Sequence, residues 1–179
     1  PRLDSMNATC LAMAALEAIW ARAVYADDGA MVEPVIFEED GRLNLVGARH
    51  PLLLAALGER TVPIELSAGA AVCTLVVTGP NTGGKTVVLK TAGLFCLMAQ
   101  SGMHVPGEPG TGMSCFAEVL ADIGDEQSIQ QSLSTFSGHV KNVVSILGKT
   151  GPGALVLLDE LGAGTDPSEG AALGVAILE

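Results

Sequence analysis

The pattern of apolar and polar positions divides the chain into segments, and each segment predicts either a helix or a strand. Residues 5–26 predict a helix, because they are rich in Ala and contain no Gly or Pro, and Asp27-Asp28-Gly29 ends it. Two strands, 32–37 and 43–46, follow with a turn signal between them, which predicts a hairpin. Pro34 cannot donate a ladder hydrogen bond, so the first of these strands is expected at a sheet edge.

The second half of the chain carries near-continuous apolar runs, which are typical of strands buried on both faces. The two runs are residues 70–78 and 154–158. Helices are predicted at 85–101, at 135–149 and from 168 onward, and shorter strands near 103–105 and 116–123. Strands that alternate with helices favour an α/β fold with a mainly parallel sheet flanked by helices.

A glycine-rich segment after the first of these runs carries the clearest chemistry. Gly79-Pro80-Asn81-Thr82-Gly83-Gly84-Lys85-Thr86 fits the pattern G-x-x-x-x-G-K-[ST] between a predicted strand and a predicted helix. Backbone N–H groups of such a loop and the following helix N-terminus form an anion site, so we expect it to cradle phosphates. Lys85 would reach the β- and γ-phosphates, and the Thr86 hydroxyl would bind Mg²⁺. The alternative is a glycine-rich turn that matches by chance, which the flanking elements disfavour.

Two carboxylates follow the second apolar run. Asp159 and Glu160 stand at the predicted carboxyl end of a strand, where ligands bind in open α/β sheets. We expect Asp159 to hold the hydrated Mg²⁺ and Glu160 to orient or deprotonate the attacking water. The alternative for an isolated Asp-Glu pair is a solvated turn, and the preceding aliphatic strand argues against it.

Composition limits the classes of protein that remain. Hydrophobic residues make up 49% of the 179 positions, enough for a substantial core. The net charge of −11, with nine Lys and Arg, argues against a nucleic-acid-binding surface in this part of the protein. Four widely spaced cysteines favour reduced thiols. No uninterrupted apolar run is long enough to span a bilayer and no signal peptide is visible, so we expect a cytoplasmic protein without a membrane partner. Because the chain begins at Pro1 and stops at Glu179 inside a helical pattern, we expect a fragment.

Several segments together resemble the MutS family of ATPases. Residues 78–86, with Pro-Asn after the first Gly, resemble its Walker A loop, and Arg49-His50-Pro51 matches a motif upstream of that loop. Residues 158–166 resemble its Walker B strand and the loop that follows. Residues 121–136 and 162–167 are similar to the second bacterial branch, which suppresses homologous recombination and carries a C-terminal Smr nuclease domain.

The resemblance implies a P-loop NTPase of the ABC type, with ATP sites shared across a homodimer. Residues 1–28 would be a lever-type helix from the end of the preceding region, and 29–179 the first part of the ATPase domain. Ser134 matches the signature residue that reaches the partner's γ-phosphate; the alternative, a helix N-cap at Ser134-Thr135, is compatible with that role. Val62 or Ile64 is expected to pack against adenine, whereas His139 receives no catalytic role.

The function implied is ATP hydrolysis that drives a dimeric clamp on branched DNA, or on stalled ribosomes and their RNA, through regions outside this chain. The parent protein would also be an endonuclease through its Smr domain. The alternative is a nucleotide-switched scaffold ATPase of the structural-maintenance type, which the Asp-Glu-Gln-Ser-Ile segment at 125–129 and the lack of heptads disfavour. A phosphotransferase would need a basic lid, for which the chain offers few residues. By itself the chain is expected to bind adenine nucleotide weakly or not at all, and to hydrolyse it slowly.

Overall fold

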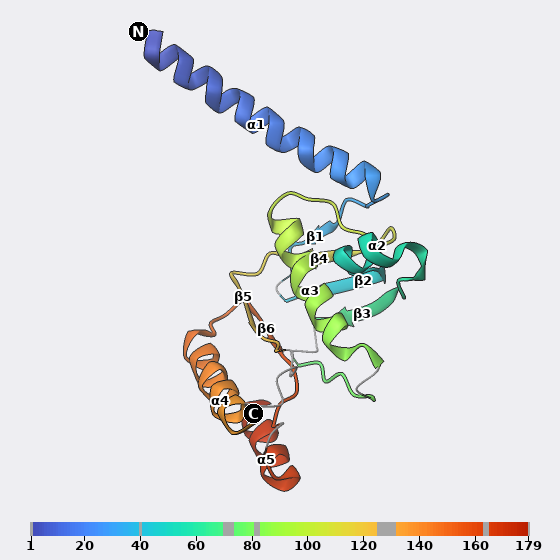
Figure 1. The fold of residues 1–179 in the computed structure, drawn as a ribbon, viewed down its shortest axis with the longest axis vertical. Coiled ribbons are helices and arrows are strands. Elements are labelled where there is room, and N and C mark those ends of the chain that lie inside the picture. Colours follow the sequence, from blue (N-terminus) through green and yellow to red (C-terminus); the bar gives the residue numbers. More distant parts are fainter. Residues whose placement is uncertain are drawn as a thin grey trace.

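The computed structural model describes residues 2–39, 41–69, 74–80, 83–124, 132–162 and 165–178, with side chains outside the description at Arg2 and 132–137. Figure 1 shows the order of its elements along the chain. They are α1 (Arg2–Asp28), β1 (Val35–Phe37), β2 (Leu43–Ala48), α2 (Pro51–Leu57), the 3₁₀ turn η1 (Gly58–Arg60), β3 (Ile64–Ala68), α3 (Lys85–Gln100), β4 (Gly112–Ser114), β5 (Glu118–Asp122), α4 (Ser132–Lys149), β6 (Ala154–Leu158) and α5 (Pro167–Leu178).

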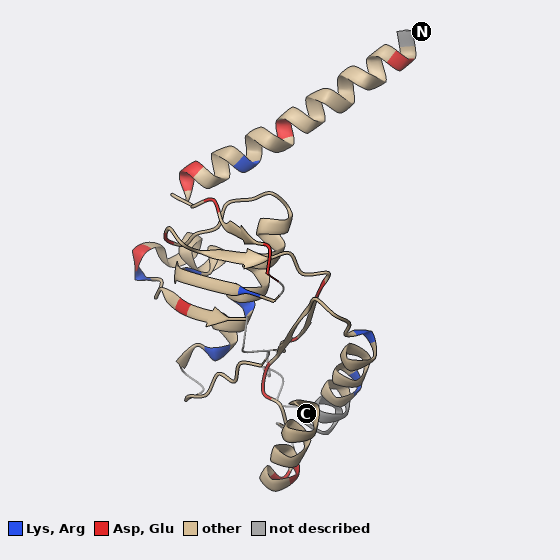
Figure 2. Cartoon of the chain, turned by 180° about the vertical axis from the view of Figure 1, so that it is seen from behind, with Lys and Arg blue, Asp and Glu red and all other residues tan. Residues whose placement is uncertain are grey.

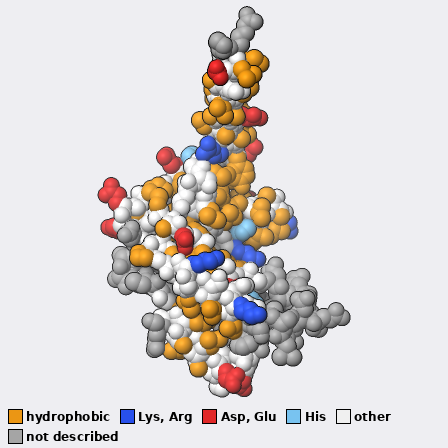
Figure 3. Space-filling model, turned by 90° about the vertical axis from the view of Figure 1, so that its left-hand side faces the viewer, with side chains coloured by type: hydrophobic (Ala, Val, Ile, Leu, Met, Phe, Trp, Pro, Cys, Tyr) orange, Lys and Arg blue, Asp and Glu red, His pale blue; other side chains and the backbone are white. Residues whose placement is uncertain are grey.

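Helix α1 confirms the predicted N-terminal helix and projects away from the rest of the molecule (Figure 1). Its attachment lies in the last turns, where Arg22 Nη1 donates to the carbonyl of Ser101 at 2.8 Å and Ala26 is buried. The remaining length exposes a continuous series of large apolar side chains (Figure 3). They are Leu3, Met6, Leu11, Met13, Leu16, Ile19, Trp20, Val24 and Tyr25.

By length and composition α1 also meets the requirement for a membrane span. The candidate span covers Leu3–Asp28, and none of its qualifying 18-residue window is buried inside the structure. A single such helix near an N-terminus is weak evidence for a span, because core helices and signal sequences have the same length and composition.

The strands form two separate sheets among the described residues. The larger sheet has the order β1-β4-β2-β3, in which β2 runs antiparallel to both β3 and β4, and only β1 and β4 are parallel. The smaller sheet pairs β5 with β6 in parallel, from Glu118 opposite Ala154 to Asp122 opposite Leu158.

The expected ABC-type P-loop fold, built on a mainly parallel sheet, is therefore wrong: this is a small domain with a mixed sheet and flanking helices. The predicted hairpin is also wrong, because β4 lies between β1 and β2. Its first strand does lie at the sheet edge, as Pro34 indicated. Alternation of helices and strands constrains the chain's path only locally, so it did not determine which strands pair.

The apolar run at 70–78 accounts for much of this difference. Residues 70–73 lie outside the described residues, and 74–78 form no strand. Leu75 and Val76 are 46% and 63% exposed, so the described part of the run is not buried on either face of a sheet. The other strong run is confirmed as β6.

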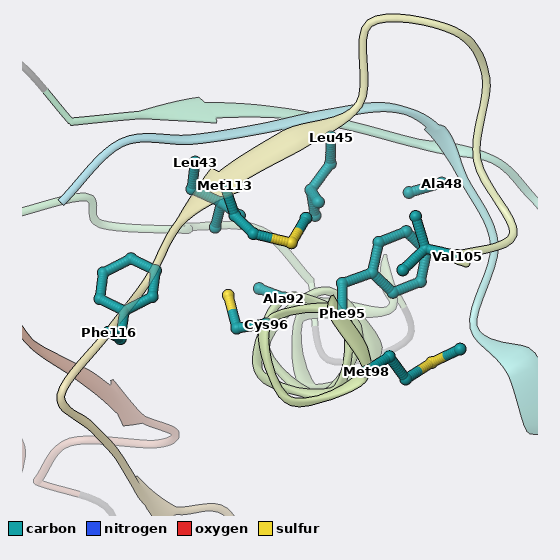
Figure 4. Packing of buried hydrophobic residues seen from close by; sticks show 10 residues of the cluster. All are labelled: Leu43, Leu45, Ala48, Ala92, Phe95, Cys96, Met98, Val105, Met113 and Phe116. Carbon is teal, nitrogen blue, oxygen red and sulfur yellow. The ribbon is translucent and has the colours of Figure 1, made fainter. Parts of the chain in front are cut away.

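Helix α3 connects the two sheets. One of its faces packs on the mixed sheet, where Phe95 and Cys96 lie opposite Leu45 and Met113, and all four are at most 1% exposed (Figure 4). Toward the smaller sheet, a Cβ at Gly93 would come within 2.6 Å of the end of the Leu157 side chain on β6. The helix that begins at the glycine-rich loop is thereby fixed against β6, the strand that Asp159 follows.

Cysteine labelling tests this packing. Burial raises the pKa of the Cys96 thiol to about 12, whereas Cys10 and Cys115 are exposed. Because the thiolate is the reactive form, we expect an alkylating reagent at pH 8 to modify Cys96 about a thousandfold more slowly than Cys115. Peptide mass spectrometry measures the rates, and guanidinium should make them equal. Rapid native labelling of Cys96 would contradict the packing of α3.

Candidate active site

The described part of the glycine-rich loop leads directly into α3. Gly84 caps the helix in the left-handed region, with φ of 79°, which a residue with a Cβ adopts rarely. Before it, the N–H of Gly83 donates to the carbonyl of Pro80 at 2.9 Å. Asn81 and Thr82 lie outside the described residues. The first N–H groups of α3 have no partners within the helix and form the kind of site that binds anions.

Lys85 closes this loop. Its Nζ donates to the carbonyl oxygen of Gly79 at 2.5 Å, so the side chain of the first helical residue folds back to the first loop residue. The Lys85 side chain is half-buried, and its ammonium lies beside the loop backbone. This arrangement holds a positive charge at the place where a phosphate chain would be cradled.

Thr86 and Asp159 meet, although they are 73 positions apart in the sequence. The Thr86 hydroxyl donates to Asp159 Oδ2 at 2.5 Å in a half-buried position. α3 supplies the hydroxyl in its first turn, and β6 supplies the carboxylate directly after its last residue. A hydroxyl and a carboxylate oxygen are hard donors suited to Mg²⁺, which binds through one or two such groups together with substrate phosphates. No larger cluster of His, Cys, Asp or Glu suited to a metal occurs in the described ranges.

Glu160 has an unusual backbone. Its φ is 51°, in the left-handed region that costs free energy for a residue with a Cβ. The N–H of Glu160 donates to Asp159 Oδ1 at 3.1 Å, while the other Asp159 oxygen accepts from Thr86. The Glu160 side chain is exposed. The Asp159 carboxylate therefore fixes two things: the turn that carries Glu160 and the position of the Thr86 hydroxyl.

Helix α5 holds the other end of this turn. Gly162 and Gly170 approach so closely that a Cβ on either would overlap the carbonyl oxygen of the other. Asp166 precedes α5 and accepts hydrogen bonds from the N–H and hydroxyl of Ser168, and these lower the pKa of the Asp166 carboxyl. The N–H of Gly170 donates to the Asp166 carbonyl at 2.8 Å. Residues 163–164 lie outside the described part.

The remaining predicted residues are placed with less detail. Ser134 is the third residue of α4, and the structure describes its backbone but not its side chain. Val62 is 77% exposed, and Ile64 begins β3 and packs partly against the core. His50, of the Arg-His-Pro motif, precedes α2, and burial together with the charge of Lys90 lowers its pKa. The roles proposed for these residues stay predictions.

Sequence reasoning missed the residue beside Asp159 on the neighbouring strand. Asp122 ends β5, is 8% exposed, and accepts the Asp159 N–H at its carbonyl oxygen at 3.0 Å. Its carboxylate receives His139 Nδ1 at 2.9 Å and Asn142 Nδ2 at 3.1 Å. The sequence signal that could have identified Asp122 is a polar residue at the end of an apolar strand, the same pattern that identified Asp159.

A cavity of about 180 Å³ adjoins these groups. Asp122, His139, Asp159 and Glu160 contribute to its polar wall, and apolar side chains of α4 and α5 together with Leu161 and Gly162 of the turn form the remainder. The carboxylate turn after β6 and the end of β5 thus share one space with α4.

A pair of glycine substitutions tests how the turn is held. Gly170→Ala should force Gly162 away, destabilise the protein by about 1–3 kcal/mol, and displace the Glu160 turn. Gly174→Ala on the same helix is the matched control, because a Cβ there meets nothing within 4 Å, and it should stabilise by about 0.5–1 kcal/mol. Urea unfolding measures both. Equal effects of the two substitutions would refute the close contact.

Comparison with known proteins agrees with the motifs. The family described as MutS domain V matches residues 75–179. The Endonuclease MutS2 of Pelotomaculum thermopropionicum is 55% identical over 174 residues, 97% of this chain and 22% of that protein. Those of Halothermothrix orenii and Ruminiclostridium cellulolyticum are 55% and 53% identical, over 92% and 99% of this chain and 20% and 22% of theirs.

These relatives confirm the resemblance to the second bacterial branch, and the chain spans only 20–22% of their length. The family match covers more than half of the chain, including the glycine-rich segment from Gly79 and the whole of β6. The chain belongs to the MutS family.

Proposed function

We propose that this chain binds and hydrolyses ATP with Mg²⁺, as one part of a larger cytoplasmic MutS-family protein that acts on DNA. The observation that carries the proposal is the Thr86–Asp159 hydrogen bond, beside Lys85 and Glu160. The four residues proposed for ATP hydrolysis come from two segments more than 70 positions apart, and the Thr86–Asp159 hydrogen bond joins those segments at the start of α3.

Each group has a task in that chemistry. N–H groups of Gly79 to Thr86 would cradle the phosphates, and Lys85 would move from the Gly79 carbonyl to the β- and γ-phosphates. Thr86 and Asp159 would hold Mg²⁺, which neutralises phosphate charge when bound. Glu160 would position the attacking water and accept its proton. Val62 or Ile64 would contact adenine.

The partners follow from what this chain contains. Lys and Arg are few and scattered among acidic residues (Figure 2), so a DNA- or ribosome-binding face would belong to other regions of the protein. The nuclease activity named for the relatives would likewise reside outside this chain. Ser134, in the first turn of α4, would complete the site of a second copy in a homodimer.

Two substitutions in the full-length protein separate binding from hydrolysis. Lys85→Ala should weaken ATP binding by at least about tenfold, because it removes the charge paired with the phosphates. Glu160→Gln should leave the ATP Kd nearly unchanged and lower kcat by about 10²–10⁴, because it removes the base. Calorimetry gives Kd, and phosphate release gives kcat.

The matched controls are Lys149→Ala, at the exposed end of α4, and Glu118→Gln, at the opposite end of β5 from Asp122. Neither should alter Kd or kcat. Native turnover by the Glu160→Gln protein would remove Glu160 from its role, and unchanged binding by the Lys85→Ala protein would refute the phosphate loop.

A further inference from the structure

We propose that Asp122, His139 and Asn142, here called the Asp122 cluster, position helix α4 relative to the Asp159-Glu160 turn during ATP hydrolysis. The inference rests on the proposed function and adds a positioning role for residues that the phosphate-loop chemistry does not use. Its basis is one buried residue, Asp122, whose carboxylate is hydrogen-bonded to α4 and whose main-chain carbonyl is hydrogen-bonded to Asp159.

The main chain of Asp122 determines where the chain leaves β6. Asp122 is the last residue of β5 in register, opposite Leu158, and its carbonyl accepts the Asp159 N–H at 3.0 Å. Asp159 in turn binds Thr86 and the N–H of Glu160. A shift of the Asp122 backbone therefore moves the candidate metal ligand and the candidate base together.

The side chain of Asp122 determines where α4 lies. His139 and Asn142 are three residues apart and thus on one face of the helix. Each supplies a donor to a different carboxylate oxygen, so the two hydrogen bonds define both the position and the rotation of α4. Hydrogen bonds to an ionised carboxylate are short and strong, and burial of Asp122 protects them from water.

The ring of His139 lies beside Gly124. Because the carboxylate only accepts, Nδ1 carries the proton that points to Asp122. The Cε1–Nε2 edge of the ring faces Gly124, where a Cβ would come within 3.3 Å of Cε1 and 3.7 Å of Nε2. A glycine at this position leaves room for the ring to lie in the orientation that the Asp122 bond requires.

The cluster and the turn also line the same cavity, and the first turn of the same helix carries Ser134. A rigid link from Asp159 through Asp122 to α4 therefore connects the chain's own site with the residue proposed for the partner's site. We infer that the cluster acts on the catalytic step and on assembly of the shared site, whereas the phosphate loop binds nucleotide without it.

A matched pair of substitutions in the full-length protein tests this role. His139→Asn retains an N–H donor near the position of Nδ1, and His139→Gln places it near Nε2 instead. The His139→Asn protein should retain kcat to within about threefold of the native value, whereas His139→Gln should lower kcat by about tenfold or more. The ATP Kd of both variants should stay within about twofold of the native value. Gln favours helices more than Asn does, so helix propensity predicts the opposite order.

Two further variants support the interpretation. Asp122→Asn should reproduce the His139→Gln defect, because an amide cannot accept on both sides. Gly124→Ala should lower kcat in the same direction without removing any polar group, since its Cβ presses on the His139 ring. Thermal unfolding is measured for every variant, and kcat is compared well below each Tm.

The outcomes are distinct. Equal kcat values for His139→Gln and His139→Asn, whether normal or reduced, would overturn the positioning role. A fall in kcat that only follows a fall in Tm would do the same. Hydrolysis at the native rate by the Lys85→Ala protein would instead refute the proposed function. If the Lys85→Ala protein loses activity while the His139→Gln protein keeps the native kcat, only the positioning role of the Asp122 cluster is refuted.

Discussion

The contact between the Thr86 hydroxyl and the Asp159 carboxylate is the constraint on which the rest of the site depends. It exists only if the start of α3 and the end of β6 stay within hydrogen-bonding distance. The long apolar face of α3 meets this requirement, because it packs on the mixed sheet through Phe95 and Cys96 and on β6 at Gly93. The hydrophobic core therefore has a direct geometric consequence, which is the alignment of two polar residues from distant segments.

Local chemistry was readable from the sequence, and strand pairing was not. The helix after Gly84, the strand before Asp159 and the breaks at Gly29 and Gly151-Pro152-Gly153 depend on a few adjacent residues, and the structure confirms α3 and β6. The order β1-β4-β2-β3 depends on contacts between distant segments, for which a single sequence carries no period. The exposure of Leu75 and Val76 shows the same limit of prediction from a single sequence, because their segment is apolar in composition and yet does not form a buried strand.

Asp122 illustrates why part of the site escaped the sequence analysis. Its strand is short and partly exposed, and its partners His139 and Asn142 lie 17 and 20 residues away. A polar residue at a strand end predicts an edge position, but the sequence does not reveal that both carboxylate oxygens will be occupied by one helix. Only the pairing of β5 with β6 makes Asp122 a neighbour of Asp159. Topology thus determined which of the chain's acidic residues belong to the site.

The turn after β6 shows how such a site is held under strain. Glu160 has a left-handed backbone that a residue with a Cβ adopts at a cost, and two neighbouring interactions oppose its relaxation. Asp159 holds the Glu160 N–H on one side, and the approach of Gly162 to Gly170 anchors the chain on the other. A glycine at 160 would relieve the strain but remove the carboxylate proposed as the base. The unfavourable backbone is therefore best understood as the cost of presenting that carboxylate beside Asp159, offset by the packing of α5 against the turn.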